Sequence, residues 1–161
     1  MEKIPMTTYG YTKLEAELKH RIRVERPSII DDIAEARAHG DLSENAEYHA
    51  AKEKQGINEA VIKDLEAKLS LAEKIDPTTM SGSRVTIGAT VEVVDVDSDE
   101  EKTYILVGPS EADIDKGLIS ITSPLGRALI SKEEGDEAVF KAPGGIHTYE
   151  ILGVKFQEID V

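Results

Sequence analysis

The hydrophobic positions in the first half of the chain recur at the spacing of an α-helix. Between Thr12 and Ile75 they fall three, four or seven residues apart, as on one apolar face of a helix. The first run is Leu14, Leu18, Ile22, Ile29, Ile33 and Ala36, and the second run is Ala46, Ala50, Ile57, Val61, Leu65, Leu69, Ala72 and Ile75. This pattern predicts two helices with a break between them.

The two runs mirror each other about a point near position 43. Leu14 lies as far before that point as Ala72 lies after it, and the other apolar positions pair in the same way. The symmetry predicts an antiparallel two-helix coiled-coil hairpin over residues 1–76, with its tip near 40–46. At 1.5 Å per residue, the first arm would extend ~40 Å.

Turn-forming and capping residues gather at the predicted tip. Gly40 suits the end of the first helix. Asp41 followed by Glu44 fits a capping box for the returning helix, and Ser43 is the alternative N-cap. Further back, Pro27 predicts a kink or a short break in the first helix, because proline cannot donate a backbone hydrogen bond.

The second half of the chain has the patterns of strands and turns. A linker is expected over residues 77–83, where Thr, Ser, Gly and Met follow a proline. Strands are expected over 89–96, 102–108, 118–122, 137–142 and 147–156. Ser123 and Pro124 form a good helix start, which predicts a short helix after the third strand. The fold class is therefore α+β, with the helical hairpin followed by a small antiparallel β domain over 84–161.

Charge restricts the partners that the chain can bind. The 161 residues carry a net charge of −13. Residues 1–76 have 12 basic and 16 acidic side chains, and residues 77–161 have 7 and 16. Such a balance excludes binding of duplex nucleic acid along a broad face. Any nucleic-acid contact should be local to the first half, and the second half suits a protein partner.

The composition also bears on location and on covalent chemistry. The chain has no cysteine, which excludes disulfides and cysteine-based zinc sites. The sequence contains no apolar run long enough for a membrane span. The first residues, "MEKIPMTTYG", lack the apolar core of a signal peptide. A cytoplasmic location is expected.

Three segments carry a resemblance to a known family. They are "IAEARAHGDLSENAEYHAAKE" at the predicted tip, "SPLGRALISKEEGD" and "KAPGG". These segments, in this order, resemble the bacterial Gre family of transcript cleavage factors, which act in transcription elongation. The resemblance covers essentially the whole chain. Within the family, the chain is most similar to the branch that has few basic residues beside the tip.

The resemblance implies a fold and a mode of action. The domain over 84–161 would be similar to the FK506-binding proteins and would dock on RNA polymerase. The apolar loop-to-helix character of the stretch around Ile119–Leu129 makes it the expected contact, and most of its residues also fit the core. The hairpin would enter the secondary channel of the polymerase. There it would stimulate the intrinsic cleavage of backtracked RNA by the polymerase, so the protein would not itself be an enzyme.

The resemblance also implies site residues. Asp41 and Glu44 would be the catalytic carboxylates and would bind Mg²⁺ only within the polymerase complex, since two carboxylates alone make a poor Mg²⁺ site. Arg37 and Lys52 would form a small basic patch for the 3′ end of the nascent RNA, with Lys54 as a weaker member. Contact with nucleic acid is thus expected only within the elongation complex, and neither a membrane nor a small-molecule substrate is expected as a partner.

Other interpretations remain open from the residues alone. Asp41 and Glu44 fit ordinary helix caps, and Arg37 and Lys52 fit a solvated helix face. Tyr48 suits either stacking on a base or covering the end of the apolar seam. Two other functions also fit a helical hairpin, namely a Gre-like inhibitor or modulator of RNA polymerase without cleavage and a coiled-coil adaptor or chaperone.

Overall fold

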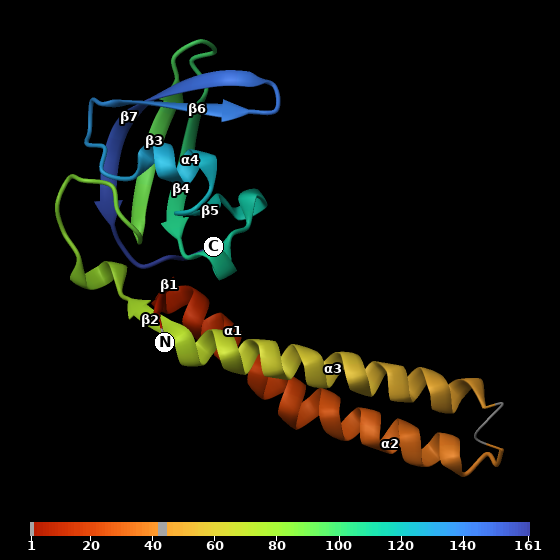
Figure 1. Cartoon of the computed structure of the whole chain (residues 1–161). Coiled ribbons are helices and arrows are strands. Elements are labelled where there is room, and N and C mark those ends of the chain that lie inside the picture. Colours follow the sequence, from red (N-terminus) through yellow and green to blue (C-terminus); the bar gives the residue numbers. More distant parts are fainter. Residues whose placement is uncertain (1, 42–44) are drawn as a thin grey trace. The chain divides into compact units, whose positions relative to one another are not determined.

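The chain divides into two compact units. The structure, a computed structural model, describes residues 2–41 and 45–161. The hairpin unit is Thr12–Leu71, and the sheet unit combines Met1–Tyr11 with Ala72–Val161 (Figure 1). The fold class is confirmed as α+β. The composition suggested a boundary after residue 76, but in the structure the first eleven residues group with the sheet unit.

The hairpin unit consists of two antiparallel helical arms that lie side by side (Figure 1). The first arm contains α1 (Thr8–His20), a π-helical turn (Arg21–Glu25) and α2 (Arg26–Arg37), and the second arm is α3 (Ala46–Leu71). Pro27 is the second residue of α2, and only Arg26 separates it from the π-helical turn. The predicted interruption before Pro27 is therefore confirmed. It takes the form of a π-helical turn. The wider hydrogen-bond pattern of this turn accommodates Pro27, which has no backbone N–H to donate.

In the first half of α3 the seam lies one residue away from the predicted apolar run, whereas the two coincide at Leu65 and Leu69. Ala51, Asn58 and Ile62 are buried, whereas Ile57 is 57% exposed and Ala50 is also exposed. The less exposed positions follow one another at alternate steps of three and four residues, namely Tyr48, Ala51, Gln55, Asn58, Ile62, Leu65 and Leu69. This is the 3.5-residue period of a coiled coil. The predicted seam positions Ala46, Ala50 and Ile57 were wrong.

The buried amide of Asn58 explains the displaced seam. Asn58 is only 3% exposed. Its Nδ2 donates to the backbone carbonyl of Arg21 at 3.2 Å, and its Oδ1 accepts from Arg21 Nη1 at 3.3 Å. A polar side chain occupies the seam because its hydrogen bonds are satisfied there, in the π-helical turn of the other arm. An apolar pattern in the sequence cannot reveal such a position.

An ion pair joins the two arms near the π-helical turn, and it predicts a pH dependence. Arg26 donates from Nε and Nη2 to the two carboxylate oxygens of Glu59, each at 2.8 Å. The hydrogen bonds from Arg26 lower the pKa of Glu59 below its ordinary value. The pair therefore stabilises the hairpin at neutral pH, and this contribution is lost as the pH falls through the lowered pKa.

Replacing Glu59 should therefore lower the thermal stability of the hairpin at neutral pH only. We expect Glu59→Gln to lower the melting temperature of the helical signal slightly at neutral pH, since both partners are partly exposed. The difference from the wild type should vanish in acid, well below the ordinary carboxylate pKa. Circular dichroism melts at both pH values measure this, with the exposed Glu53→Gln as control. A difference that persists in acid would contradict the assignment.

The sheet unit is built on a five-stranded sheet with the order β5-β4-β3-β7-β6 (Figure 1). Its strands are β3 (Ala89–Asp95), β4 (Glu101–Val107), β5 (Leu118–Ser120), β6 (Glu137–Ala142) and β7 (Gly145–Phe156). All neighbours pair antiparallel except β4 and β5, which are parallel. The predicted sheet is thus present, but it is mixed instead of wholly antiparallel. The chain between β4 and β5 crosses over through two 3₁₀ turns, which lets β5 run in the direction of β4.

Successive side chains of β4 belong alternately to two apolar clusters, which lie on opposite faces of the sheet. Tyr104 and Leu106 belong to the larger cluster. The short helix α4 (Pro124–Leu129) packs on this face through Leu129, which is fully buried. Ile105 and Val107 point to the smaller cluster on the other face. The predicted start of α4 is confirmed, since Ser123 Oγ accepts from the backbone N–H of Gly126 at 3.0 Å.

A second, two-stranded sheet was not predicted. β1 (Ile4–Thr7) pairs in parallel with β2 (Ala72–Ile75), so the last four residues of the predicted second helix form a strand instead. Helical periodicity continues through Ala72 and Ile75, but pairing with β1 satisfies the backbone of both segments. Tertiary pairing thus overrides the local pattern. Across the described residues, 2–41 and 45–161, none of the helices has the length and apolar character that crossing a membrane requires.

Candidate functional site

The first arm of the hairpin ends in a turn that leads directly to Asp41. The backbone N–H groups of His39 and Gly40 donate to the carbonyls of Ala36 and Arg37, at 3.2 and 3.3 Å. Gly40 has a φ of 109°, which a residue with a side chain rarely adopts. The predicted role of Gly40 at the helix end is therefore confirmed. Asp41 follows immediately and is exposed.

Asn45 starts the second arm. Its Oδ1 accepts from the backbone N–H of Tyr48 at 3.1 Å, which is the geometry of a helix N-cap. Its Nδ2 donates to the carbonyl of Ala36, at the end of the other arm, at 2.7 Å. The predicted capping box with Asp41 as N-cap is wrong, because α3 begins at Ala46 and Asn45 caps it.

The structure describes only one of the two predicted catalytic carboxylates. Asp41 lies in the turn at the end of the hairpin, as expected. Glu44, together with the alternative cap Ser43, lies outside the described residues. Among the residues that are described, no three His, Cys, Asp or Glu side chains gather closely enough to hold a metal ion. The Asp41 carboxylate is a hard oxygen donor that suits Mg²⁺, but only as part of a larger ligand set.

Arg37 and Lys52 lie in one groove on one flank of the hairpin seam. This basic groove has a volume of about 370 Å³ and is lined by Ile30, Ile33, Ala34, Arg37, Lys52 and Gln55. The Arg37 guanidinium lies 5.9 Å from the centre of the Tyr48 ring, and Lys52 Nζ donates to Gln55 Oε1 at 3.1 Å. The predicted pair is thus brought together from the two arms, a short distance from the tip.

The side chain of Tyr48 is partly buried in the hairpin. Its ring packs against the cluster formed by Ile29, Ile33 and Ala51. Of the two interpretations of this residue, covering the end of the seam is the one that its packing supports. The ring also holds the Arg37 guanidinium on its outer face, in a cation–π contact.

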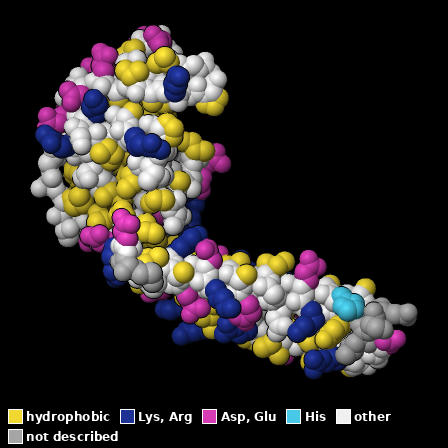
Figure 2. Space-filling view, viewed as in Figure 1, with side chains coloured by type: hydrophobic (Ala, Val, Ile, Leu, Met, Phe, Trp, Pro, Cys, Tyr) yellow, Lys and Arg dark blue, Asp and Glu magenta, His cyan; other side chains and the backbone are white. Residues whose placement is uncertain are grey.

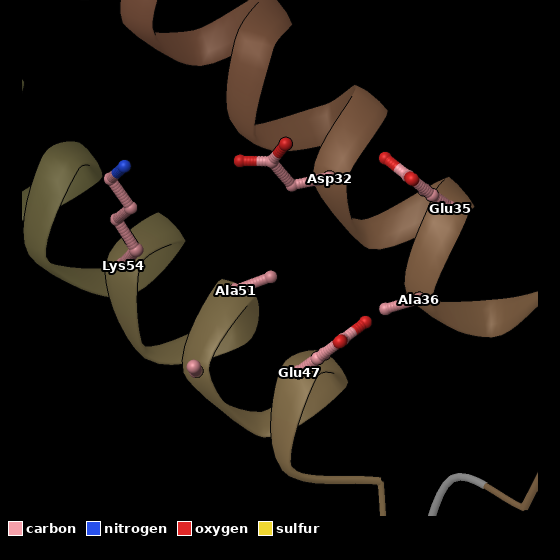
Figure 3. A pocket seen from close by; sticks show the side chains of 7 residues that line it. Asp32, Glu35, Ala36, Glu47, Ala51 and Lys54 are labelled. Carbon is pink, nitrogen blue, oxygen red and sulfur yellow. The ribbon is translucent and has the colours of Figure 1, made fainter. Parts of the chain in front are cut away.

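The opposite flank of the seam is acidic. Its groove, about 340 Å³ in volume, is lined by Asp32, Glu35, Ala36, Glu47, Ala50, Ala51 and Lys54 (Figure 3). Figure 3 shows Asp32 and Glu35 on α2 and Glu47 on α3, with Ala36 and Ala51 between the helices. Lys54, a weaker candidate for the basic patch, lines this acidic groove and is separated from Arg37 and Lys52 by the seam. Lys54 therefore does not belong to the basic groove.

Charges of both signs are mixed elsewhere on the hairpin. Figure 2 shows Lys and Arg side chains among acidic and apolar ones along its visible face. The face seen in Figure 2 does not present the continuous positive surface that binding along a nucleic-acid backbone requires. Charge is separated locally between the two grooves beside the seam. Basic side chains lie on one flank and mainly acidic ones on the other.

The sheet unit has an apolar groove of about 480 Å³ beside α4. It is lined by Ala112, Ile114, Leu118, Ile119, Ser120, Ser123, Pro124, Leu125, Phe140, Lys141, Ala142 and Pro143. The expected docking stretch around Ile119–Leu129 contributes only its first part to this groove, since Leu129 is fully buried in the core. Ile114 is 66% exposed and enlarges the apolar surface from the 3₁₀ turn before β5.

Sequence reasoning missed the double role of Asn45. A signal was present, because asparagine is among the best N-cap residues and stands directly before the helical run. The bond to Ala36 has no signal in the sequence, since it depends on how closely the two arms approach each other.

Comparisons with known proteins agree with this geometry. The chain matches the N-terminal model of the GreA/GreB transcription elongation factors over residues 4–73 and the C-terminal model over residues 80–156. It is 60% identical over 156 residues to transcription elongation factor GreA of Ruegeria pomeroyi, covering 97% of this chain and 99% of the relative. It is 58% identical, with the same coverage of both chains, to transcription elongation factor GreA of Brucella anthropi.

A solved structure of the same family is also similar. GreA factor homolog 1 of Thermus thermophilus is 28% identical, covering 95% of this chain and 99% of that chain, with a TM-score of 0.44. Both of these relatives are named GreA, which is the branch of the family that the sequence favoured. The matches to both family models and the identity over nearly the full length place this chain in the GreA/GreB family of transcription elongation factors.

Proposed function

We propose that this protein binds RNA polymerase through the secondary channel and stimulates the intrinsic cleavage of backtracked RNA by the polymerase, which releases arrested complexes. The observation that carries the proposal is the position of Asp41, an exposed carboxylate in the turn of a helical hairpin. Family membership supplies the context of transcription elongation. The protein acts as a factor for another enzyme and has no complete active site of its own.

Asp41 and Glu44 are the proposed catalytic carboxylates. Each provides oxygen ligands for a Mg²⁺ ion that the polymerase and the RNA bind as well, because Mg²⁺ is usually held by one or two carboxylates together with phosphates and waters. A Mg²⁺ ion held by these carboxylates within the complex would supply an activated water and would neutralise charge on the scissile phosphate. The hairpin contributes by placing the carboxylates, and the rigid arms limit the freedom that must be lost on binding.

The basic groove supplies the proposed RNA contact. Arg37 and Lys52 come from different arms and face the same groove, which suits two phosphates of the 3′ segment of the nascent RNA. The cation–π contact with Tyr48 keeps the Arg37 side chain close to the hairpin surface. Contact with nucleic acid then occurs only inside the elongation complex, in agreement with the net charge of −13.

Removing the basic side chains should weaken cleavage moderately. A charge-assisted hydrogen bond contributes about 1.5 kcal/mol, which corresponds to roughly tenfold in rate or affinity. We therefore expect Arg37→Ala combined with Lys52→Ala to lower the cleavage rate roughly tenfold or more. Lys54→Ala, on the acidic flank, is the matched control and should cleave as the wild type does. Equal losses in both variants would contradict a role that is specific to the basic groove.

The sheet unit is the proposed docking module. Its apolar groove beside α4, extended by the exposed Ile114, offers a surface for the outer part of the polymerase. Exposed apolar surface with polar side chains at its edge is typical of a protein interface. Lys141 at the rim adds a positive charge to a unit that is otherwise acidic.

An assay on stalled elongation complexes tests the proposal. Polymerase backtracked on a template with labelled RNA is incubated with the protein, and short fragments from the RNA 3′ end are measured with Mg²⁺ and after its chelation. The proposal expects Mg²⁺-dependent fragments. Slower nucleotide addition without fragments would support an inhibitor instead, and failure to bind polymerase would support an adaptor or chaperone.

A further inference from the structure

Asn45 links the two arms of the hairpin at the turn. Its side-chain amide uses both of its polar atoms. The Oδ1 atom caps α3 at Tyr48 N, and the Nδ2 atom donates to Ala36 O on the opposite arm at 2.7 Å. Asn45 is half-buried, and Ala36 is 2% exposed. The second bond is the shorter of the two and joins the last turn of α2 to the start of α3.

The bond reaches a carbonyl that the helix itself leaves poorly satisfied. Carbonyls in the last turn of a helix have no partner four residues further along. Ala36 O accepts from the backbone of His39 at 3.2 Å, and Asn45 supplies a second and shorter hydrogen bond. Because Ala36 is buried in the seam, losing the side-chain donor would leave this oxygen with only the backbone N–H groups of its own arm as donors. The link therefore sets the distance between the two chain ends that enter and leave the turn.

Asp41 lies between the linked residues, five positions after Ala36 and four before Asn45. A link between Ala36 and Asn45 therefore limits the backbone conformations that are open to Asp41. Placement matters for a carboxylate that completes a metal site, since an error of about 1 Å can cost roughly 100-fold in rate.

We propose that Asn45 is a positioning residue that orients Asp41 through its bond to the Ala36 carbonyl. The proposal rests on the proposed function, because the orientation of Asp41 matters only if its carboxylate completes a metal site. It differs from helix capping, which Asp or Ser at this position would perform as well. Asparagine alone among the good cap residues carries a planar amide that accepts at one end and donates from the other.

Substitutions separate the two bonds. Asn45→Asp and Asn45→Ser keep a cap acceptor and remove the amide donor, and only the first adds charge. We expect both variants to lower the maximal cleavage rate roughly tenfold at saturating factor. The factor concentration for half-maximal cleavage and the helical content should stay at the wild-type values. Ala46→Gly weakens the first turn of α3 without touching either bond, and it should retain cleavage.

The free protein offers an independent measurement of the link. In NMR spectra, the side-chain amide protons of Asn45 should exchange with solvent more slowly than those of the exposed Gln157. Equal exchange of the two amides would overturn the proposal. So would wild-type cleavage by Asn45→Ser, or an equal loss in Ala46→Gly.

The proposed function fails separately. If Asp41→Asn cleaves as the wild type does, the catalytic role of Asp41 is refuted, and with it the reason for positioning. If Asp41→Asn is inactive while Asn45→Ser is fully active, only the positioning proposal is refuted.

Discussion

Asp41→Asn should abolish most of the stimulated RNA cleavage while leaving binding to the polymerase intact. The substitution keeps the shape of the side chain and removes its negative charge. An amide oxygen is a weaker ligand for Mg²⁺ than a carboxylate, so the Mg²⁺ ion of the polymerase complex would be poorly held. Losing about 3 kcal/mol of transition-state stabilisation corresponds to a rate roughly 100-fold lower. Fragment release from backtracked complexes at saturating factor measures the effect.

A charge-matched control shows whether position or charge matters. Asp31 is an exposed carboxylate on α2, away from the turn, and Asp31→Asn removes the same charge from the same arm. This variant should cleave as the wild type does. Competition between each variant and the wild-type protein for the polymerase reports on binding. Undiminished cleavage by Asp41→Asn and by Glu44→Gln would refute the catalytic role of the turn.

The second large effect should come from Glu111, which holds the N-terminal strand within the sheet unit. Its carboxylate accepts from the backbone N–H of Thr7 at 2.9 Å and of Gly108 at 2.7 Å, and from the hydroxyl of Thr7. Thr7 is fully buried, and a Cβ at Gly10 would overlap the Glu111 carboxylate. Glu111→Ala would therefore leave these three hydrogen-bond donors without their acceptor. Each donor that stays buried and unpaired costs about 1–3 kcal/mol.

We expect Glu111→Ala to lower the free energy of unfolding of the sheet unit by about 3 kcal/mol. The chain has no tryptophan, so the near-ultraviolet signal of tyrosine is the natural probe. Tyr104 and Tyr149 stack in the core of this unit, with ring centres 6.2 Å apart. Urea unfolding followed by that signal measures the loss. The exposed Glu134→Ala is the control, and equal stability of the two variants would rule out the proposed role of Glu111.

The elements that could be predicted are those whose signal is local. The two helical arms, the turn at Gly40, the interruption before Pro27 and the Ser123 cap follow from periodicity and from backbone chemistry. Each depends on residues within one or two turns of the position itself. The same holds for the placement of Asp41 in the turn.

The features that could not be predicted depend on distant partners. Asn58 enters the seam because Arg21, on the other arm, satisfies its amide. The strand β2 replaces the end of a helix because β1 lies beside it. Asn45 links the arms because their ends approach closely enough for one side chain to reach across. In each case a contact between segments far apart in the sequence outweighs the local preference.

The amino-acid sequence alone established a helical hairpin with a carboxylate at its turn, because helix periodicity, glycine and proline act over a few residues. Folding in three dimensions settled which side chains share a surface. It placed Arg37 and Lys52 on one flank of the seam and Lys54 on the other. The physical reason is that the seam of a coiled coil is selected by packing and hydrogen bonding between arms. A displacement of one residue along α3 turns each side chain by about 100° around the helix axis.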